Sequence, residues 1–133
     1  MAPQVGFKYE PQVYALFRIV LGFLFLAHGS QKLFGVPGGS YPDVSAFVRF
    51  VAGPIEFFGG ILIMVGLFAH LAAFVASGTM AVAYWTVHGL QSFWPISNGG
   101  ELAVLYCFAF LAIAGRGAGV WSLDEQRRAS RAK

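Results

Sequence analysis

Charged residues are scarce in this chain. They account for 11% of its 133 residues, whereas hydrophobic residues account for 57%. A soluble domain carries about 25% charged residues, so this composition excludes an ordinary soluble domain. It predicts one integral membrane domain over residues 1–133, surrounded by the lipid bilayer. The 17 glycines agree with this class, because small residues let transmembrane helices approach closely.

Cysteine is almost absent as well. The one cysteine, Cys107, lies in an apolar run, so it has no partner for an internal disulfide and we expect a small buried side chain. The HxxxH, HExxH and paired-cysteine spacings of metal sites are also missing. Because His28 and His88 are isolated histidines, we expect no metal site and disfavour haem.

The modest positive charge of the chain gathers at one end. The net charge is +3, and most of the basic excess follows Arg116, in Arg127, Arg128, Arg131 and Lys133. A short basic tail beside a final span is what the positive-inside rule predicts for a cytoplasmic end. We therefore expect a cytoplasmic C-terminus and no nucleic-acid partner.

Four apolar runs are candidates for spanning helices, which need about 20 mostly apolar residues. They cover about residues 13–34, 54–68, 71–89 and 100–114, and a polar, basic tail follows at 116–133. This pattern predicts an all-α fold, an integral membrane four-helix bundle. Because the number of spans is even, the N- and C-termini are both expected to be cytoplasmic.

The second run is short, and the residues before it suggest how it is extended. Asp43 is a candidate cap for a helix in which Val44, Phe47, Val48 and Val51 recur at helical spacing. That segment lies at the membrane interface, or it continues the second span through a kink at Pro54. We favour the continuation.

Ionisable residues within and beside these runs are the candidates for function. A charge inside lipid is costly, and such residues usually face the bundle interior and mark a site. The candidates for an intramembrane polar cluster that binds a ligand are Glu56, Lys32, His28, His88, Glu101 and Arg18.

The predicted orientation places these candidates by depth. All except Arg18 fall near the outer ends of the spans, so side chains from four helices are expected to converge in the outer leaflet. We predict that Lys32 pairs with Glu56. Arg18 lies about 21 Å of helix from Lys32, in the inner leaflet, and has no obvious acidic partner.

Helical phase supports the pairing. At about 100° per residue, stripes form from Arg18, Gly22, Phe25, Gly29 and Lys32 in the first span and from Glu56, Gly59, Gly60, Ile63 and Leu67 in the second. Glycine next to charge on both stripes predicts that the two faces pack together inside the bundle.

Structural explanations remain open for each of these residues. Lys32 is also consistent with a side chain that reaches the interface, and Glu101 with a first-turn acid that the helix dipole favours. His88 is consistent with a helix end near water. Glu56 is also consistent with a purely structural ion pair.

Several motifs resemble the DoxX family, and the likeness runs in order from Arg18 to Asp124. The motifs are Arg18-Ile19-Val20-Leu21-Gly22, His28-Gly29-Ser30-Gln31-Lys32-Leu33, Glu56-Phe57-Phe58-Gly59-Gly60, Asn98-Gly99-Gly100-Glu101-Leu102 and Gly115-Arg116-Gly117-Ala118-Gly119. The resemblance implies a small four-span protein of the bacterial cytoplasmic (inner) membrane. His70 departs from the pattern, since family members often carry Arg or Lys in the short inner turn.

The resemblance also implies an association with redox chemistry. The family name comes from a subunit linked to thiosulfate:quinone oxidoreduction, and other members look like membrane partners of thiol proteins. One hypothesis is a redox component that binds quinone, the candidate cofactor, or a small sulfur or thiol species at the polar cluster. The alternative is a non-catalytic accessory or scaffold subunit of a larger membrane redox complex. A redox complex or a homo-oligomer is the expected protein partner, and the sequence leaves open whether the chain is itself an enzyme.

Overall fold

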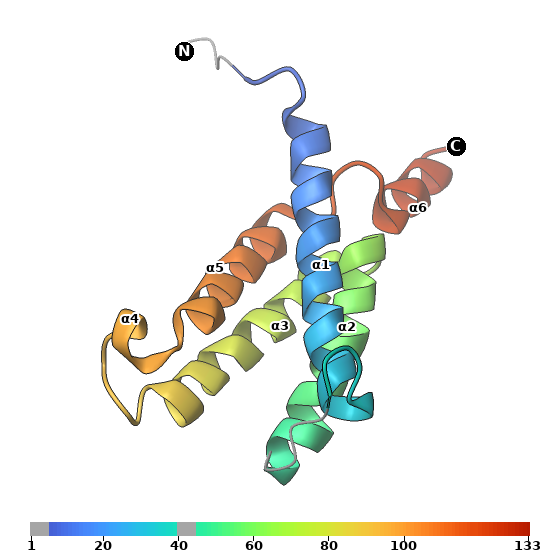
Figure 1. Ribbon diagram of the computed structural model, residues 1–133. Helices are drawn as coiled ribbons and strands as arrows, with labels where there is room; N and C mark the ends of the chain where they lie inside the picture. The colour runs from blue at the N-terminus through green and yellow to red at the C-terminus, as the bar shows by residue number, and fades with distance from the viewer. Residues whose placement is uncertain (1–5, 40–44) are drawn as a thin grey trace.

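The computed structural model describes residues 6–39 and 45–133, which contain helices and no strand. The elements in chain order are α1 (Glu10–Phe34), the π-helical segment η1 (Val48–Ala52), α2 (Gly53–Val65), α3 (Ala69–Ala83), the π-helical segment η2 (Tyr84–His88), α4 (Pro95–Asn98), α5 (Glu101–Arg116) and α6 (Leu123–Arg131) (Figure 1). The all-helical fold predicted from the sequence is therefore present in the described residues.

Three helices are long and apolar enough to cross a membrane. They are Glu10–Phe34, Val48–Val65 and Ala69–His88. The fourth predicted span corresponds to α5, which has 16 residues and a length of about 24 Å. This is shorter than the roughly 30 Å hydrocarbon core of a bilayer.

The second of these helices continues through Pro54, as expected. Proline lacks the N–H that an α-helix would use at this position, and the chain before it forms a π-helical turn. In that turn the Gly53 N–H donates to the Val48 carbonyl. The proposed cap Asp43 lies outside the described residues, and within them the Ser45 hydroxyl accepts a hydrogen bond from the Val48 N–H.

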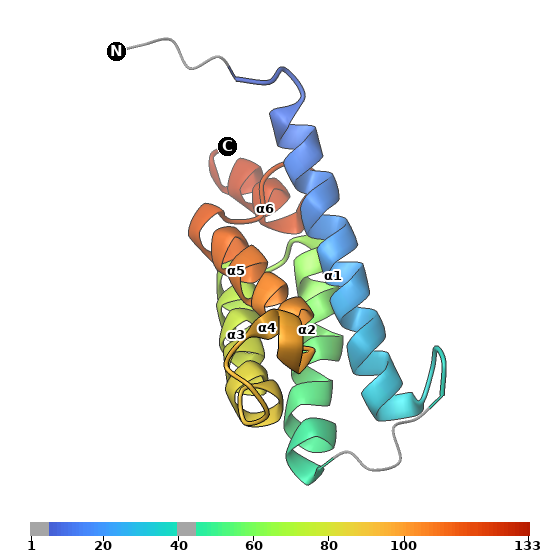
Figure 2. The ribbon, with the colours of Figure 1, turned by 60° about the vertical axis from the view of Figure 1, so that its left-hand side comes forward.

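The helices form two pairs. α1 lies along α2, α3 lies along α5, and the short α2–α3 turn joins the pairs (Figures 1 and 2). The pairs are close together at the end of the bundle that carries residues 66–68, here called the turn end. They spread apart toward the end that carries residues 32–35 and 84–100, here called the open end (Figure 1).

The backbones of α1 and α2 touch at glycines. A Cβ atom added at Gly22 would lie 2.6 Å from the Met64 nitrogen, and one at Gly60 would lie 2.5 Å from the Leu26 nitrogen. A Cβ at Gly29 would overlap the backbone nitrogen of Phe57. The predicted packing of the two glycine stripes is thus confirmed. Because glycine has no side chain, the two backbones touch directly and the helix axes lie close together.

Aromatic side chains fill the space between the two helix pairs. Phe25 of α1 is 1% exposed and reaches α5, where its ring centroid lies 4.5 Å from that of Phe110. Tyr106 stacks on Phe110 at 5.5 Å, with an interplanar angle of 11°. This layer holds α1 against α5 although the two helices belong to different pairs.

Arg18 is fully buried at the turn end and bonds only to backbone carbonyls. Its Nε donates to Ala118 at 2.7 Å, and its Nη1 donates to Ile63 and Met64 at 2.8 and 2.6 Å. Its Nη2 donates to the carbonyls of Val120 and Trp121 at 3.3 and 2.8 Å, so Arg18 bonds to five carbonyls in all. A guanidinium has five N–H donors, so every donor is used. No acidic partner for Arg18 was found in the sequence. Instead, the guanidinium is bonded by carbonyls of the last turn of α2 and of the segment after α5.

The C-terminal segment closes the turn end. Asp124 accepts hydrogen bonds from the N–H groups of Phe68 and Ala69, each at 2.9 Å, and so caps the start of α3. The tail at 116–133, which was predicted only as polar and basic, contains the helix α6. Ser122 is its N-cap, and the Glu125 N–H donates a hydrogen bond to the Ser122 hydroxyl. The Ser-x-x-Glu pattern of a capping box is the sequence signal for this helix.

We expect Gly29→Ala to destabilise the protein by about 1–3 kcal/mol, because the added methyl group overpacks the α1–α2 contact. Gly78→Ala on α3 is the matched control, since nothing lies within 4 Å of its Cβ position and helix propensity favours alanine by up to about 1 kcal/mol. Equilibrium unfolding in detergent micelles measures both effects. Equal stability of the two variants would contradict the observed contact.

We expect Arg18→Lys to destabilise the protein by about 3 kcal/mol or more. Lysine offers three donors, so at least two carbonyls lose a bond to a charged donor, each contributing about 1.5–3 kcal/mol. Arg128→Lys is the control, because the Arg128 side chain is 79% exposed and surface ion pairs contribute about 1 kcal/mol or less. The same unfolding measurement compares them, and a small, equal loss in both would argue against a structural role for Arg18.

Candidate functional site

A cavity of about 660 Å³ lies between the two helix pairs at the open end. Residues of α1, η1, α2, α3, η2 and α5 line it. Its volume falls in the range of about 300–1,000 Å³ that small-molecule sites occupy. The cavity results from the spreading of the helix pairs, and three of the six predicted polar residues line it, namely Lys32, Glu56 and His88.

Lys32 and Glu56 form the predicted ion pair on the wall of this cavity. The Lys32 Nζ lies 2.6 Å from Oε1 and 2.5 Å from Oε2 of Glu56. The Glu56 side chain is 2% exposed and that of Lys32 is 18% exposed. A buried carboxylate requires such a partner, because an uncompensated buried charge costs about 3–5 kcal/mol. Lys32 therefore neutralises Glu56 and remains accessible from the cavity.

Tyr106 was missed by the sequence analysis as a site residue. It is 4% exposed and lines the cavity. Its hydroxyl makes no hydrogen bond with the residues that the structure describes. It is not among their fully buried polar atoms without a partner, so it is accessible for a hydrogen bond to a ligand. The only signal for it is a phenol within the apolar run of the fourth predicted span.

His28 is half-buried beside this tyrosine. Its ring meets that of Tyr106 edge to face, with centroids 5.9 Å apart and an interplanar angle of 89°. It does not belong to the cavity lining. Edge-to-face packing is a favourable aromatic geometry, so the His28 ring supports the Tyr106 ring without lining the cavity itself.

His88 lines the cavity from the end of η2. Its Nδ1 lies 3.1 Å from the Asn98 carbonyl oxygen. Because a carbonyl only accepts, Nδ1 carries the proton in this contact. In the neutral ring, Nε2 is then an acceptor.

Asn98 anchors the loop that holds His88 in place. Asn98 is 5% exposed, and its amide nitrogen donates to the Tyr84 hydroxyl and to the Ser92 carbonyl, at 3.1 and 2.8 Å. Its side-chain oxygen accepts from the Gly100 N–H at 2.8 Å. This buried network is a second feature that sequence analysis did not identify.

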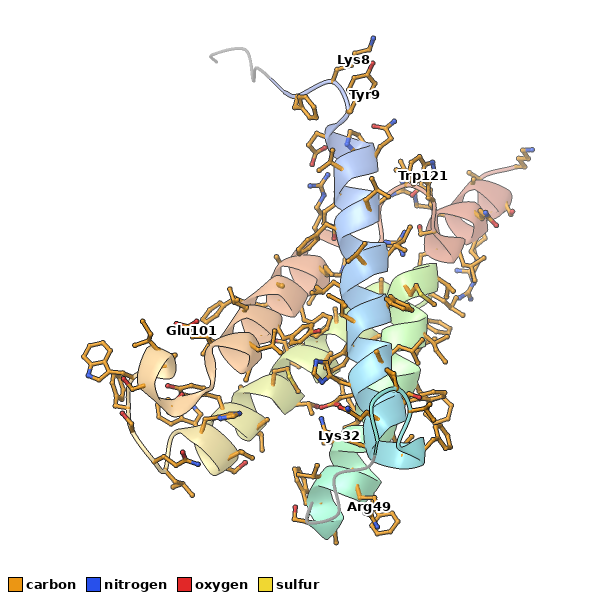
Figure 3. All side chains as sticks on the ribbon, in the orientation of Figure 1. Lys8, Tyr9, Lys32, Arg49, Glu101 and Trp121 are labelled. Carbon is orange, nitrogen blue, oxygen red and sulfur yellow. The ribbon has the colours of Figure 1, made fainter. Side chains whose placement is uncertain are left out.

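Besides His28, two more of the candidate residues lie outside the cavity lining. Arg18 is at the turn end, with its donors occupied as described above. Glu101 is exposed at the start of α5, and Figure 3 shows it away from Lys32. Its position in the first helical turn matches the alternative of an acid favoured by the helix dipole.

The remaining cavity lining is mainly apolar. Phe47, Val48, Met80, Ala83 and Leu102 contribute to it. The cavity thus combines an apolar chamber with a cationic donor at Lys32, a hydroxyl at Tyr106 and an imidazole at His88. Such a set of groups suits a flat, largely apolar molecule with polar atoms at its edge. Within the described residues, no three metal-ligating side chains gather at one point.

Comparisons with known proteins agree with this architecture. A family model described as DoxX matches residues 13–89, which begin within the first turn of α1 and include η1, α2, α3 and η2. An uncharacterized protein from Haemophilus influenzae is 42% identical over 125 residues, which are 90% of this chain and 93% of the relative. No solved structure gives a significant match. Because the family match covers more than half of the residues, the chain belongs to the DoxX family.

Proposed function

We propose that this protein binds a quinone in the cavity at the open end and serves as a component of a bacterial membrane redox system. The observation that carries the proposal concerns Tyr106, whose hydroxyl makes no hydrogen bond with the described residues. Tyr106 lines the same mainly apolar cavity as Lys32, whose ammonium is partly accessible. A hydroxyl and an ammonium are the donors that ring carbonyls require.

The shape and composition of the cavity support a lipophilic ring. Met80 and Leu102 offer apolar surface, and the chamber lies between helix pairs that spread toward one end. A ligand dissolved in the bilayer would place its ring in the chamber and its tail among lipid chains. The buried area then provides affinity, and the few polar groups provide orientation.

The residues also offer routes for protons. A bound quinone would accept two electrons and two protons and become a quinol. Lys32 and Tyr106 would donate hydrogen bonds to the ring oxygens. The His88 Nδ1 lies against the Asn98 carbonyl, so its Nε2 would be the nitrogen that faces a ring hydroxyl. Glu56 holds the Lys32 side chain at the cavity wall through their ion pair. The electrons in this proposal come from a sulfur or thiol compound, directly or through a partner protein.

We also propose that α5 is the fourth span, in the inner membrane, with both termini cytoplasmic. Its outward-facing residues include Leu105 and Phe108, which are 67% and 64% exposed and would face lipid. The basic residues after Arg116 support a cytoplasmic C-terminus under the positive-inside rule.

For the binding site, we expect Tyr106→Phe to weaken quinone binding about tenfold. The change removes only the hydroxyl and keeps the ring that packs on Phe110, and one hydrogen bond contributes up to about 1.5 kcal/mol. Calorimetric titration of the detergent-purified protein with a short-chain ubiquinone and a short-chain menaquinone measures the affinity. Tyr9→Phe is the control, because Tyr9 is 54% exposed and precedes α1.

Unchanged affinity in Tyr106→Phe, or no binding to the unaltered protein, would show the quinone assignment to be wrong. The accessory-subunit function would then be favoured if Glu56→Gln reduced co-purification of a redox enzyme. Glu101→Gln is the control for that change, since Glu101 lies outside the cavity.

For the topology, we expect opposite accessibility of two single cysteines placed in a Cys107→Ser background. Ser97→Cys, before α5, should react with a membrane-impermeant maleimide in intact bacterial spheroplasts. Ser130→Cys, in α6, should react only after the membrane is permeabilised. Both residues are exposed, so burial does not limit labelling, and reaction of both in intact spheroplasts would contradict a fourth span.

A further inference from the structure

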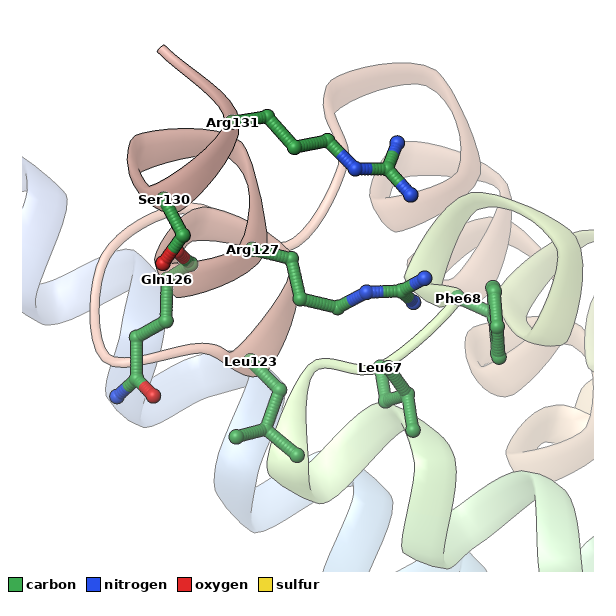
Figure 4. Close-up of a pocket in the computed structure, with 7 residues that line it drawn as sticks. All are labelled: Leu67, Phe68, Leu123, Gln126, Arg127, Ser130 and Arg131. Carbon is green, nitrogen blue, oxygen red and sulfur yellow. The ribbon is translucent and has the colours of Figure 1, made fainter. Parts of the chain in front are cut away.

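A second hollow lies at the turn end, on the opposite side of the bundle from the cavity described above. Its volume is about 720 Å³, and α6 and the α2–α3 turn form its walls. Figure 4 shows Arg127 and Arg131 extending from α6 on one side and Leu67 and Phe68 on the other. The DoxX family match ends before α6 begins.

The charge of this hollow is positive. The Arg127 guanidinium lies over the Phe68 ring, 4.9 Å from its centroid. Among the residues that the structure describes, neither Arg127 nor Arg131 forms an ion pair. Two guanidinium groups are therefore available to bind an anion, and a phosphate accepts their planar array of donors well.

The nearby acidic groups are already engaged. An adjoining hollow of about 290 Å³ shares Arg127 and Arg131 and also touches Asp124 and Arg128. Asp124 accepts the two N–H groups at the start of α3, and Glu125 pairs with Arg128 at 2.8 Å. Neither carboxylate forms an ion pair with Arg127 or Arg131, and the three arginines outnumber the two acids at this end of α6.

The floor of the hollow is apolar and continues onto the outer surface of the bundle. Phe68 and Leu123 are 54% and 40% exposed, and the next outward residues of α3, Leu71 and Phe74, are 66% and 64% exposed. α3 belongs to a helix long and apolar enough to cross a membrane. Basic groups at the end of such a helix lie at the depth of lipid headgroups.

We propose that this hollow binds the headgroup of an anionic phospholipid. Its phosphate lies between Arg127 and Arg131, and one acyl chain follows Phe68, Leu71 and Phe74 along α3. The apolar floor distinguishes a lipid from a free phosphate, which needs only the arginines. The arginines distinguish an anionic lipid from phosphatidylcholine, whose phosphate is already paired with its own cation.

Native mass spectrometry of the full-length protein in detergent tests the proposal by titration with phosphatidylglycerol, phosphatidylcholine and sn-glycerol 3-phosphate. We expect phosphatidylglycerol to bind at least tenfold more tightly than either of the others. Arg127→Gln/Arg131→Gln should weaken phosphatidylglycerol binding about thirtyfold, equivalent to about 1 kcal/mol for each arginine.

The control is Arg49→Gln/Lys133→Gln, which removes the same charge from exposed positions outside the hollow. It should leave the affinity within about twofold of the unaltered protein, and circular dichroism checks that both variants keep their helices. An equal loss in control and test variants would overturn the site in favour of general charge attraction. Binding of glycerol phosphate or phosphatidylcholine as tight as that of phosphatidylglycerol would overturn the lipid assignment.

Discussion

The close contact between α1 and α2 is the constraint on which the rest of the structure depends. Gly22, Gly29 and Gly60 let the two backbones touch, and this contact fixes how the helices are rotated against each other. With that rotation set, Lys32 faces Glu56 near one end of the pair, while Arg18 reaches the final carbonyls of α2 near the other. A side chain at the contact would displace both sets of polar groups together.

The buried charges at the two ends of this helix pair have different kinds of partner. Arg18 is enclosed by backbone carbonyls that use all of its donors, so it stabilises the turn end and has no donor left for a ligand. Glu56 is equally buried, but its partner Lys32 remains partly exposed to the cavity. Tyr106 lines the same cavity, and its hydroxyl has no hydrogen-bond partner in the part of the chain that the structure describes. The groups that remain available to bind a ligand therefore lie at the open end, where the polar side chains have fewer hydrogen-bond partners within the protein.

The segment after α5 connects the bundle to its second polar surface. Its carbonyls accept hydrogen bonds from the Arg18 side chain, and its Asp124 caps the start of α3. These bonds hold α6 beside the α2–α3 turn, so Arg127 is positioned over Phe68. The same contacts that close the bundle thus orient the arginines of α6. The molecule consequently has an apolar chamber with polar donors at one end and a cationic hollow with an apolar floor at the other.

The sequence by itself determined the helical class and the approximate boundaries of the apolar helices, because hydrophobic runs are local properties of a chain. Helical phase and opposite charge also predicted the Lys32–Glu56 pair, which the structure confirms. The sequence also identified the glycine stripes, since their period follows from 3.6 residues per turn. Only the tertiary structure decided that Arg18 bonds to carbonyls 45 to 103 residues away and that Glu101 lies outside the cavity lining. It also decided that Tyr106 lines the cavity without a hydrogen-bond partner for its hydroxyl among the described residues. Those properties depend on how the two helix pairs spread and on where the C-terminal segment returns, and distances between segments far apart in the chain are not encoded by any local pattern.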